Sequence, residues 1–144
     1  MPVTHLLDTS VYSQPIRKMP VQTALDRWEA AGDTAVVSSV ICEAEVLFGI
    51  RKEKRRNNDT KIGERYDALL KGKCDLLPVD QSVAEIYAEM RDDLQSRGES
   101  VADMDLLIAA TAKANNLIVA TLNTNDFHVI QGVIVEDWSQ PLPA

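Results

Sequence analysis

The chain has 144 residues, of which 45% are hydrophobic and 26% charged, and its formal net charge at pH 7 is −7. This length accommodates one domain whose core needs no disulfide, so we expect a single domain over residues 1–144. No apolar run reaches the roughly 18 residues of a membrane helix, no secretory signal opens the chain, and Cys42 and Cys74 are isolated. These features argue against membrane and disulfide-rich classes and predict a cytoplasmic protein.

The first half of the chain alternates short apolar runs with helical patterns. Residues 3–8 predict a strand, and a helix follows from Pro20 to Gly32. Residues 34–39 predict a second strand. A longer helix is expected over residues 41–56, and another from residue 60 to a stop at Gly72.

The next segment predicts an edge strand and two further helices. Residues 76–79 predict a short strand whose Pro78 favours a sheet edge. Asp80 or Ser82 is expected to cap a helix that Gly98 ends. Ser100 and Asp103 resemble a capping box, which would begin a helix that is rich in alanine and buried on most sides.

Two strands complete the expected fold. The continuous apolar run 117–122 is typical of a strand at the centre of a sheet. A last short strand is expected at residues 133–135. Because strands and helices alternate, we predict a three-layer α/β/α fold with a central, mostly parallel sheet.

Acidic residues occur at the ends of the predicted strands or at the starts of neighbouring helices. Strand ends in an open α/β sheet meet at one edge, so these carboxylates are expected to share a pocket. Such a pocket repels itself unless a hard divalent cation neutralises it, which predicts a Mg²⁺ or Mn²⁺ site and phosphoryl-transfer chemistry. The residues are Asp8, Glu45, Asp105 and Asp126.

Some of these acids also have a simpler structural interpretation. Asp8 suits a helix N-cap, and Asp126 suits a turn. Glu43 and Glu45 point about 200° apart on one helix, so only one of them can face a common site. Ile41, Ala44, Leu47 and Phe48 form the main apolar arc of that helix, which favours Glu45 without deciding between them. Asp103 suits the helix cap better than Asp105.

Basic residues are concentrated in one segment of this acidic chain. Residues 51–61 carry a local charge of +4, which leaves −11 on the remainder. This segment either binds a phosphate backbone or is a solvated helix end whose cations complement the helix dipole. The sequence supports both interpretations equally. The cations of interest are Arg51, Lys52, Lys54, Arg55 and Arg56.

Other catalytic chemistries lack the residues that they need. His5 and His128 are too few and too far apart for a zinc site. Neither a GxGxxG loop nor a Walker A loop occurs, so no nucleotide cofactor is predicted.

Several stretches of the chain together match one known family. They are residues 6–10, 39–49, 102–112, 121–127 and 136–138. Through them the whole chain resembles PIN-domain ribonucleases of the VapC toxin type, close to the FitB branch. The resemblance implies a single PIN domain over residues 1–144.

The resemblance also implies roles for particular residues. Asp8, Asp105 and Glu45, which stands four residues before Gly49, match three metal-binding acids of the family. The fourth acid falls at the place of Asn123 or of Asp126, and we expect Asp126, with Asn123 orienting water or phosphate. Thr9 and Thr121 match hydroxyl positions that support the site.

The activity implied is Mg²⁺- or Mn²⁺-dependent hydrolysis of RNA phosphodiesters, with tRNA as a candidate substrate, leaving a 5′-phosphate and a 3′-hydroxyl. The expected partners are a VapB-like antitoxin, operator DNA through the antitoxin complex, and a second copy of the chain in a homodimer. One alternative is a catalytically weak PIN protein that acts mainly in the DNA-binding regulatory complex. A third possibility is a metal-dependent phosphohydrolase of small substrates.

Overall fold

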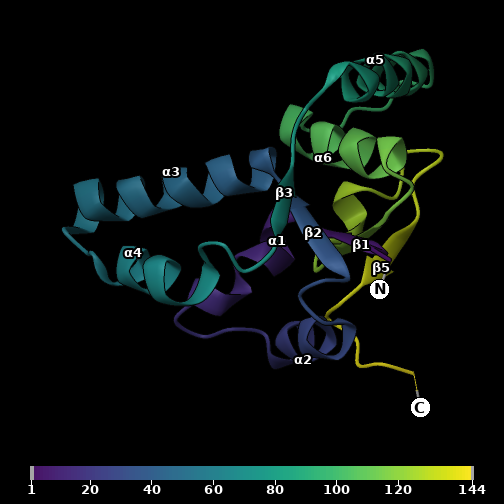
Figure 1. Cartoon of the computed structure of the whole chain (residues 1–144). Helices are drawn as coiled ribbons and strands as arrows, with labels where there is room; N and C mark the ends of the chain where they lie inside the picture. Colours follow the sequence, from purple (N-terminus) through teal and green to yellow (C-terminus); the bar gives the residue numbers. More distant parts are fainter. Residues whose placement is uncertain (1, 144) are drawn as a thin grey trace.

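Five parallel strands form the central sheet of the computed structural model, which describes residues 2–143. The order is β3-β2-β1-β4-β5, and every neighbouring pair is parallel (Figure 1). This arrangement confirms the predicted parallel α/β sheet. The strands are β1 (His5–Leu7), β2 (Val36–Ser39), β3 (Asp75–Leu77), β4 (Ile118–Thr121) and β5 (Val135–Asp137).

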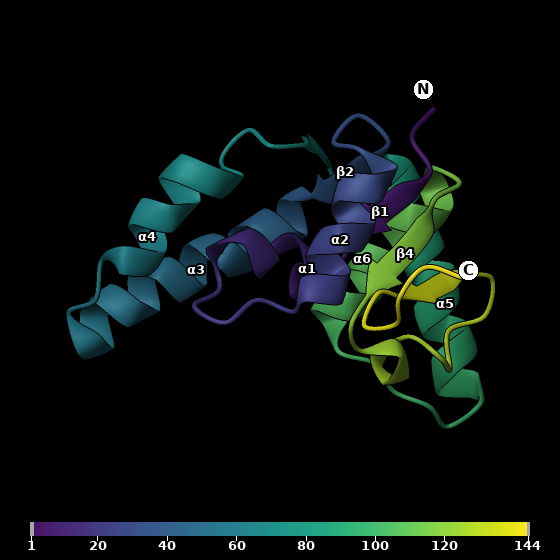
Figure 2. The same cartoon turned by 90° about the horizontal axis from the view of Figure 1, so that it is seen from below.

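Helices cover both faces of the sheet. In Figure 1, α5 and α6 lie above the sheet and α2 lies below it, and Figure 2 shows the same layers from below. The α-helices are α1 (Thr9–Tyr12), α2 (Gln22–Ala31), α3 (Val40–Asn57), α4 (Lys61–Arg65), α5 (Gln81–Ser96) and α6 (Asp103–Ala114). Three shorter helices are η1 (Gln14–Ile16), the π-helix η2 (Tyr66–Leu70) and η3 (Thr124–Asp126).

The core forms around the two innermost apolar strands. Leu6 and Leu7 of β1, and Val119 and Ala120 of β4, are completely buried, because helices pack on both sides of the sheet. The predicted central strand, β4, is an interior strand, whereas β1 occupies the centre itself. The predicted edge strand is β3, at one margin of the sheet, and it ends at Leu77, one residue before Pro78.

The long helix α3 leaves the body of the domain after its first turns. Together with α4 it projects to one side of the sheet in both ribbon views. Leu47 is 41% exposed and Phe48 is 57% exposed, whereas Cys42 and Val46 are buried. The apolar arc that the sequence indicates is therefore left uncovered at Leu47 and Phe48. Apolar spacing marks one side of a helix, but another element must lie there to cover it.

The start of α5 agrees with the sequence prediction, and the start of α6 differs from it. The Asp80 carboxylate accepts a hydrogen bond of 3.0 Å from the Val83 backbone N–H, which confirms this N-cap. The predicted capping box at α6 is absent, because Ala102 is the N-cap residue. The carboxylate of Asp103 instead accepts a hydrogen bond from the Tyr87 hydroxyl.

Two further boundaries differ from the sequence prediction. The helix expected from residue 60 consists of α4 followed by the π-helix η2. The last strand begins at Val135, two residues later than expected. The Glu136 carboxylate of that strand accepts hydrogen bonds from Arg27 at 2.6 Å and from Trp138 at 2.9 Å. The bond from Arg27 joins β5 to α2, and β5 pairs with β4 in the sheet.

None of the helices between residues 2 and 143 combines the length and the apolar character needed to cross a bilayer.

Candidate active site

The sheet topology brings the four predicted acids to one edge. Asp8 directly follows β1, Glu45 lies in the second turn of the helix that follows β2, and Asp126 belongs to η3, just after β4. These three strands are adjacent and parallel, so their carboxyl ends lie together. Asp105 approaches from the first turn of α6.

Asp8 is the most buried of these acids, with 4% of its surface exposed. It is the N-cap of α1 and accepts a hydrogen bond of 3.1 Å from the Val11 backbone N–H, so the simpler interpretation is also correct. Its other oxygen accepts a short hydrogen bond from the Thr121 hydroxyl. Burial raises the pKa of Asp8, and the hydrogen bonds to its carboxylate oppose that rise.

Two hydroxyl groups orient Asp8 and bind it to the loop after β4. Ser10 donates to Asp8 Oδ1 at 2.6 Å and accepts from the Leu122 N–H at 2.9 Å. Thr121 donates to Asp8 Oδ2 and accepts from the Asn123 N–H at 2.9 Å. Because each hydroxyl accepts from the loop, its own hydrogen is directed at the carboxylate, which favours the ionised form of Asp8.

Ser10 is absent from the predicted site residues. The sequence signal was its position in the run Asp8-Thr9-Ser10, where either hydroxyl can reach the acid. Only the structure separates the two roles. The Ser10 hydroxyl supports Asp8, whereas the Thr9 hydroxyl donates a short hydrogen bond to Glu45 Oε1.

The two glutamates of α3 have different surroundings. Glu45 is half-buried and contacts Thr9. Glu43 accepts a hydrogen bond of 3.2 Å from the Tyr12 hydroxyl, and its second carboxylate oxygen is buried without a partner among residues 2–143. Glu45 therefore belongs to the electrostatic environment of the sheet edge, and Glu43 to a contact between α1 and α3.

The pKa of Asp105 records how close the acids are. Burial and, in decreasing order, the negative charges of Asp126, Glu45 and Asp8 together raise this pKa to about 6. Five ion pairs occur within residues 2–143, and none of them includes any of the four acids. The sheet edge is therefore a site of negative charge that no Lys or Arg of the described chain neutralises.

The carboxylates do not form a closed coordination sphere. Over residues 2–143, no three His, Cys, Asp or Glu side chains lie close enough together to hold a metal ion directly. An arrangement of spaced oxygen ligands suits Mg²⁺, which keeps several of its waters when it binds to proteins. The donors are all carboxylate oxygens, the ligand type that Mg²⁺ and Mn²⁺ prefer.

A cavity of about 240 Å³ adjoins two of the acids. It lies between the loop that joins α5 to α6 and the segment around η3. Its lining consists of Glu99, Ser100, Val101, Ala102, Asp105, Asn125, Asp126, His128 and Val129.

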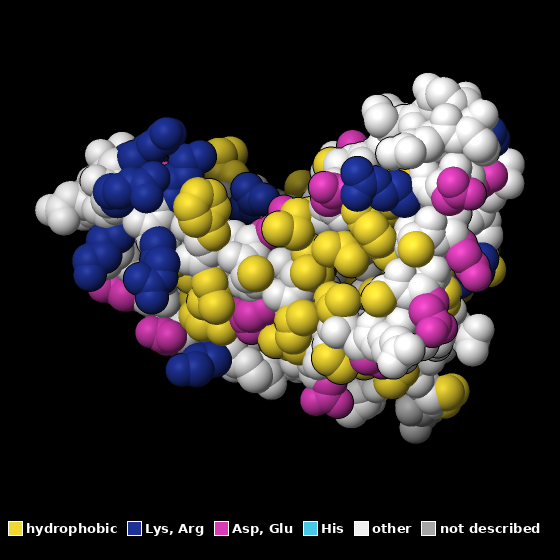
Figure 3. Space-filling view, turned by 90° about the horizontal axis from the view of Figure 1, so that it is seen from above, with side chains coloured by type: hydrophobic (Ala, Val, Ile, Leu, Met, Phe, Trp, Pro, Cys, Tyr) yellow, Lys and Arg dark blue, Asp and Glu magenta, His cyan; other side chains and the backbone are white. Residues whose placement is uncertain are grey.

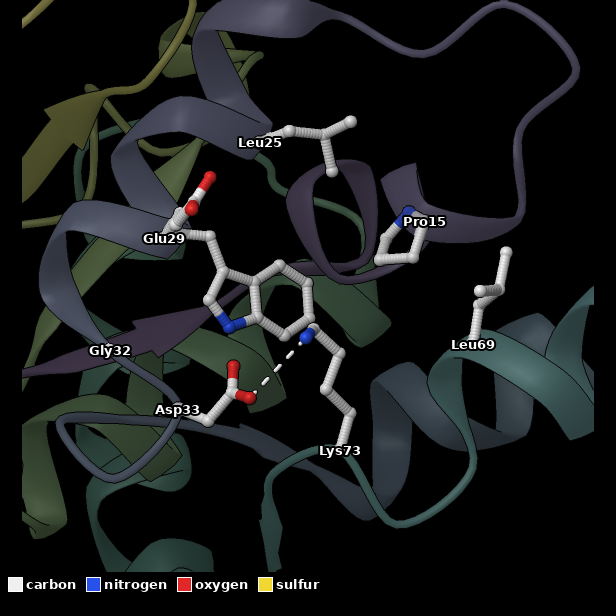
Figure 4. Close-up of a pocket in the computed structure, with 8 residues that line it drawn as sticks. Pro15, Leu25, Glu29, Gly32, Asp33, Leu69 and Lys73 are labelled. Atoms are coloured by element: carbon white, nitrogen blue, oxygen red, sulfur yellow. Dashed lines mark hydrogen bonds and ion pairs between the residues drawn. The ribbon is translucent and has the colours of Figure 1, made fainter.

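A larger cavity of about 550 Å³ lies elsewhere, between α2 and the segment that follows η2 (Figure 4). Lys73 lies over the ring of Trp28 and forms an ion pair of 3.3 Å with Asp33. None of the four acids lines this cavity, so it is separate from the candidate active site.

The five cations of the basic segment lie on α3, beyond Glu45. At 1.5 Å of rise per residue, they begin about 9 Å further along the helix axis and extend to about 16 Å. None forms an ion pair within the part of the chain that the structure describes. Figure 3 shows Lys and Arg side chains gathered at the projecting end of the molecule, with a concave margin between them and the main body.

Comparisons with known proteins agree on one family. The family model described as PIN domain matches residues 5–132. Toxin FitB of Neisseria gonorrhoeae is 32% identical, over 92% of this chain and 97% of its own length. The tRNA(fMet)-specific endonuclease VapC of Shigella flexneri is 28% identical, over 93% and 97% of the two chains. The crystal structure of VapBC2 from Rickettsia felis, bound to a DNA fragment from its promoter, superposes with a TM-score of 0.80 at 25% identity, covering 94% of this chain and 99% of that one.

Proposed function

Because the chain belongs to the PIN-domain family, we propose that it is an endoribonuclease toxin of the VapC type that depends on Mg²⁺ or Mn²⁺. The observation that carries this proposal is the group of four carboxylates at the carboxyl edge of β1, β2 and β4. Burial and the negative charges of the other three acids together raise the pKa of Asp105 to about 6. A site built in this way binds divalent cations and, through them, phosphate groups.

The roles of individual residues follow from their contacts. Asp8, Glu45, Asp105 and Asp126 would hold the metal, in part through water. A bound Mg²⁺ or Mn²⁺ supplies positive charge for the phosphate oxygens and lowers the pKa of a bound water. Thr121 and Ser10 hold Asp8 in one orientation, and Thr9 does the same for Glu45. Asn123, which is exposed and lies two residues after Thr121, would orient water or phosphate.

The relatives suggest partners as well as chemistry. The Shigella relative is named for its action on tRNA(fMet), which favours a tRNA substrate here. The Rickettsia complex supports an antitoxin partner and binding to operator DNA through that complex. We also propose a homodimer. Because these proposed partners are RNA and DNA, we also propose a cytoplasmic location.

The first test is cleavage of a total tRNA pool by purified protein free of antitoxin. We expect discrete cuts with Mg²⁺ or Mn²⁺, none with EDTA, and recovery when metal is added back in excess. Products with a 5′-phosphate and a 3′-hydroxyl are expected. If the folded, metal-supplied protein leaves RNA intact, the regulatory-complex alternative takes precedence. Hydrolysis of small phosphate esters without RNA cleavage would favour a phosphohydrolase.

We further propose that Arg51, Lys52, Lys54, Arg55 and Arg56 guide the RNA backbone towards the acids. Four of them are exposed and Lys52 is half-buried. Their lack of ion pairs within residues 2–143 and their place on the same helix as Glu45 support this proposal. The alternative, that they only complement the dipole of α3, applies to the last turn, where Lys54, Arg55 and Arg56 lie.

Replacing Arg55 and Arg56 together by Gln should separate these two roles. If these residues guide RNA, the variant should have a KM several-fold higher and an unchanged kcat. The slope of log affinity against log salt concentration should become smaller by about 1.4, because each phosphate contact to a single strand contributes about 0.7. The matched control is Lys18→Gln with Lys71→Gln, which removes the same charge from exposed positions outside α3. Equal kinetics for the two double variants would leave only the dipole role, measurable as a small loss of thermal stability.

A further inference from the structure

The short helix α1 forms hydrogen bonds with both glutamates of α3. Thr9 and Tyr12 stand three residues apart on α1, so they lie on the same side of this single turn. The Thr9 hydroxyl donates to Glu45. The Tyr12 hydroxyl donates to Glu43 Oε2 at 3.2 Å. One side of α1 therefore contacts a proposed metal ligand and also the neighbouring acid that takes no part in the metal site.

The two bonds reach α3 from different sides. Side chains two positions apart on an α-helix point about 200° apart, so Glu43 and Glu45 leave α3 in nearly opposite directions. Restraints on opposite sides of a helix oppose its rotation about its own axis, which a single bond cannot do. Because α1 is itself fixed at its start by the Asp8 cap, the pair of bonds determines where the Glu45 carboxylate points.

Tyr12 is well placed to act as the second restraint. Only 1% of its surface is exposed, and its ring stacks on that of Trp28 with centroids 6.5 Å apart. Burial and the negative charge of Glu43 raise the pKa of the Tyr12 hydroxyl, so this hydroxyl stays protonated and donates. Its position and its hydrogen-bonding role are therefore both fixed.

Fold stability alone does not account for Glu43. Its Oε1 atom is buried and has no hydrogen-bond partner among residues 2–143. A buried acceptor without a partner destabilises a fold, and two apolar side chains of the same shape can be equally stable in place of a hydrogen-bonded pair. The carboxylate therefore needs another explanation, and its bond to Tyr12 supplies one.

We propose that Tyr12 and Glu43 are positioning residues that set the rotation of α3 and thereby hold Glu45 at the metal site. This inference rests on the metal-dependent function proposed above and adds two residues to it. Neither is proposed to contact the metal. Their effect passes through Glu45, so it should appear as a change in metal affinity without a matching change in fold stability.

The test replaces both partners by apolar side chains of similar shape, Tyr12→Phe with Glu43→Met. No lone buried acceptor is left, so the melting temperature of the metal-free protein should stay within about 3 °C of the native value. Affinity for Mn²⁺, measured by electron spin resonance of the free ion, should fall by roughly tenfold, as for other groups that orient metal ligands. Excess Mn²⁺ should restore most of the RNA cleavage.

Two control variants separate the hydrogen bond from the charge. Glu43→Gln removes the charge but keeps an acceptor for the Tyr12 hydroxyl, so it should bind Mn²⁺ nearly as tightly as the native protein. Tyr87→Phe with Asp103→Asn removes one negative charge and another tyrosine–carboxylate bond, which lies between α5 and α6. This second control should also keep the native affinity.

The outcomes distinguish this inference from the proposed function. A folded double variant with native Mn²⁺ affinity, or an equal loss in Glu43→Gln, would show that the bond does not position Glu45, and the ribonuclease would stand. If the double variant does not fold, native affinity in Tyr12→Phe alone would overturn the inference. Loss of Mn²⁺ affinity in the variant, with no RNA cleaved by the native protein, would keep the positioning role without the nuclease. A native protein that binds no Mn²⁺ would overturn both.

Discussion

Replacing Asp8 by Asn is expected to lower the rate of RNA cleavage by more than about 100-fold while the protein stays folded. Groups that only orient metal ligands typically contribute about 10–100-fold, and Asp8 itself is proposed to bind the metal. Asn has nearly the same shape and is an equally good N-cap, so the bond from the Val11 N–H can persist. The fold should therefore survive the loss of the charge.

The measurement compares single-turnover cleavage of the target RNA by the native protein and by the variant, with thermal unfolding of both. Asp103→Asn is the matched control, because Asp103 is exposed and bonds to Tyr87 at the other side of the α6 N-terminus. It removes the same charge and should retain activity. A well-folded Asp8→Asn protein that cuts RNA at the native rate would show that the metal-site assignment is wrong.

Asp105→Asn is expected to increase the stability of the metal-free protein and to abolish binding of Mn²⁺. The folded-state pKa of Asp105, about 6, lies above its ordinary value of 3.8, because of burial and of the charges of Asp126, Glu45 and Asp8. The ionised form is therefore unfavourable in the fold. This penalty is present in full above pH 6 and is relieved as the pH falls towards 4. Asn carries no charge, so the substitution removes this penalty.

The gain should be on the order of 1 kcal/mol, because solvent still reaches this carboxylate and screens its neighbours. For a chain of this size that corresponds to a melting temperature higher by roughly 3 °C. Thermal unfolding of the metal-free proteins at pH 7.5 and at pH 4.5 tests the sign, since the advantage of the variant should shrink at the lower pH. An advantage of the variant that is the same at both pH values would mean that the pKa of Asp105 is not raised in the fold.

In the presence of Mn²⁺, the native protein should become more stable than Asp105→Asn. Added Mn²⁺ should raise the melting temperature of the native protein and leave that of Asp105→Asn unchanged, since only a protein that binds the ion is stabilised by it. Electron spin resonance of free Mn²⁺ measures the binding directly. Tight Mn²⁺ binding by Asp105→Asn would remove Asp105 from the proposed site.

Much of this protein follows from local patterns in its sequence. The alternation of apolar runs with helical periodicity predicted the parallel α/β sheet, because strands buried on both faces must be apolar throughout. Capping chemistry limited the N-cap of α5 to Asp80 or Ser82, because this signal acts over only three residues, and the structure has Asp80 there. The positions of the acids at strand ends predicted that they meet, since parallel strands place those ends at one edge.

Other features depend on contacts between distant segments. Periodicity could not decide between Glu43 and Glu45, and the contacts with Tyr12 and with Thr9 separate them. The exposure of Phe48 follows from the departure of α3 from the sheet, which no residue of α3 specifies.

The hydroxyl groups around Asp8 show most clearly that local sequence patterns do not specify contacts between distant segments. Ser10 and Thr121 meet at one carboxylate although 111 residues separate them in the chain. Residue types and spacing determine which chemistry is available and at which strand ends. Only the packing of β1 against β4 decides which hydroxyl reaches which oxygen, because hydrogen bonds act over about 3 Å and register is set by the whole sheet.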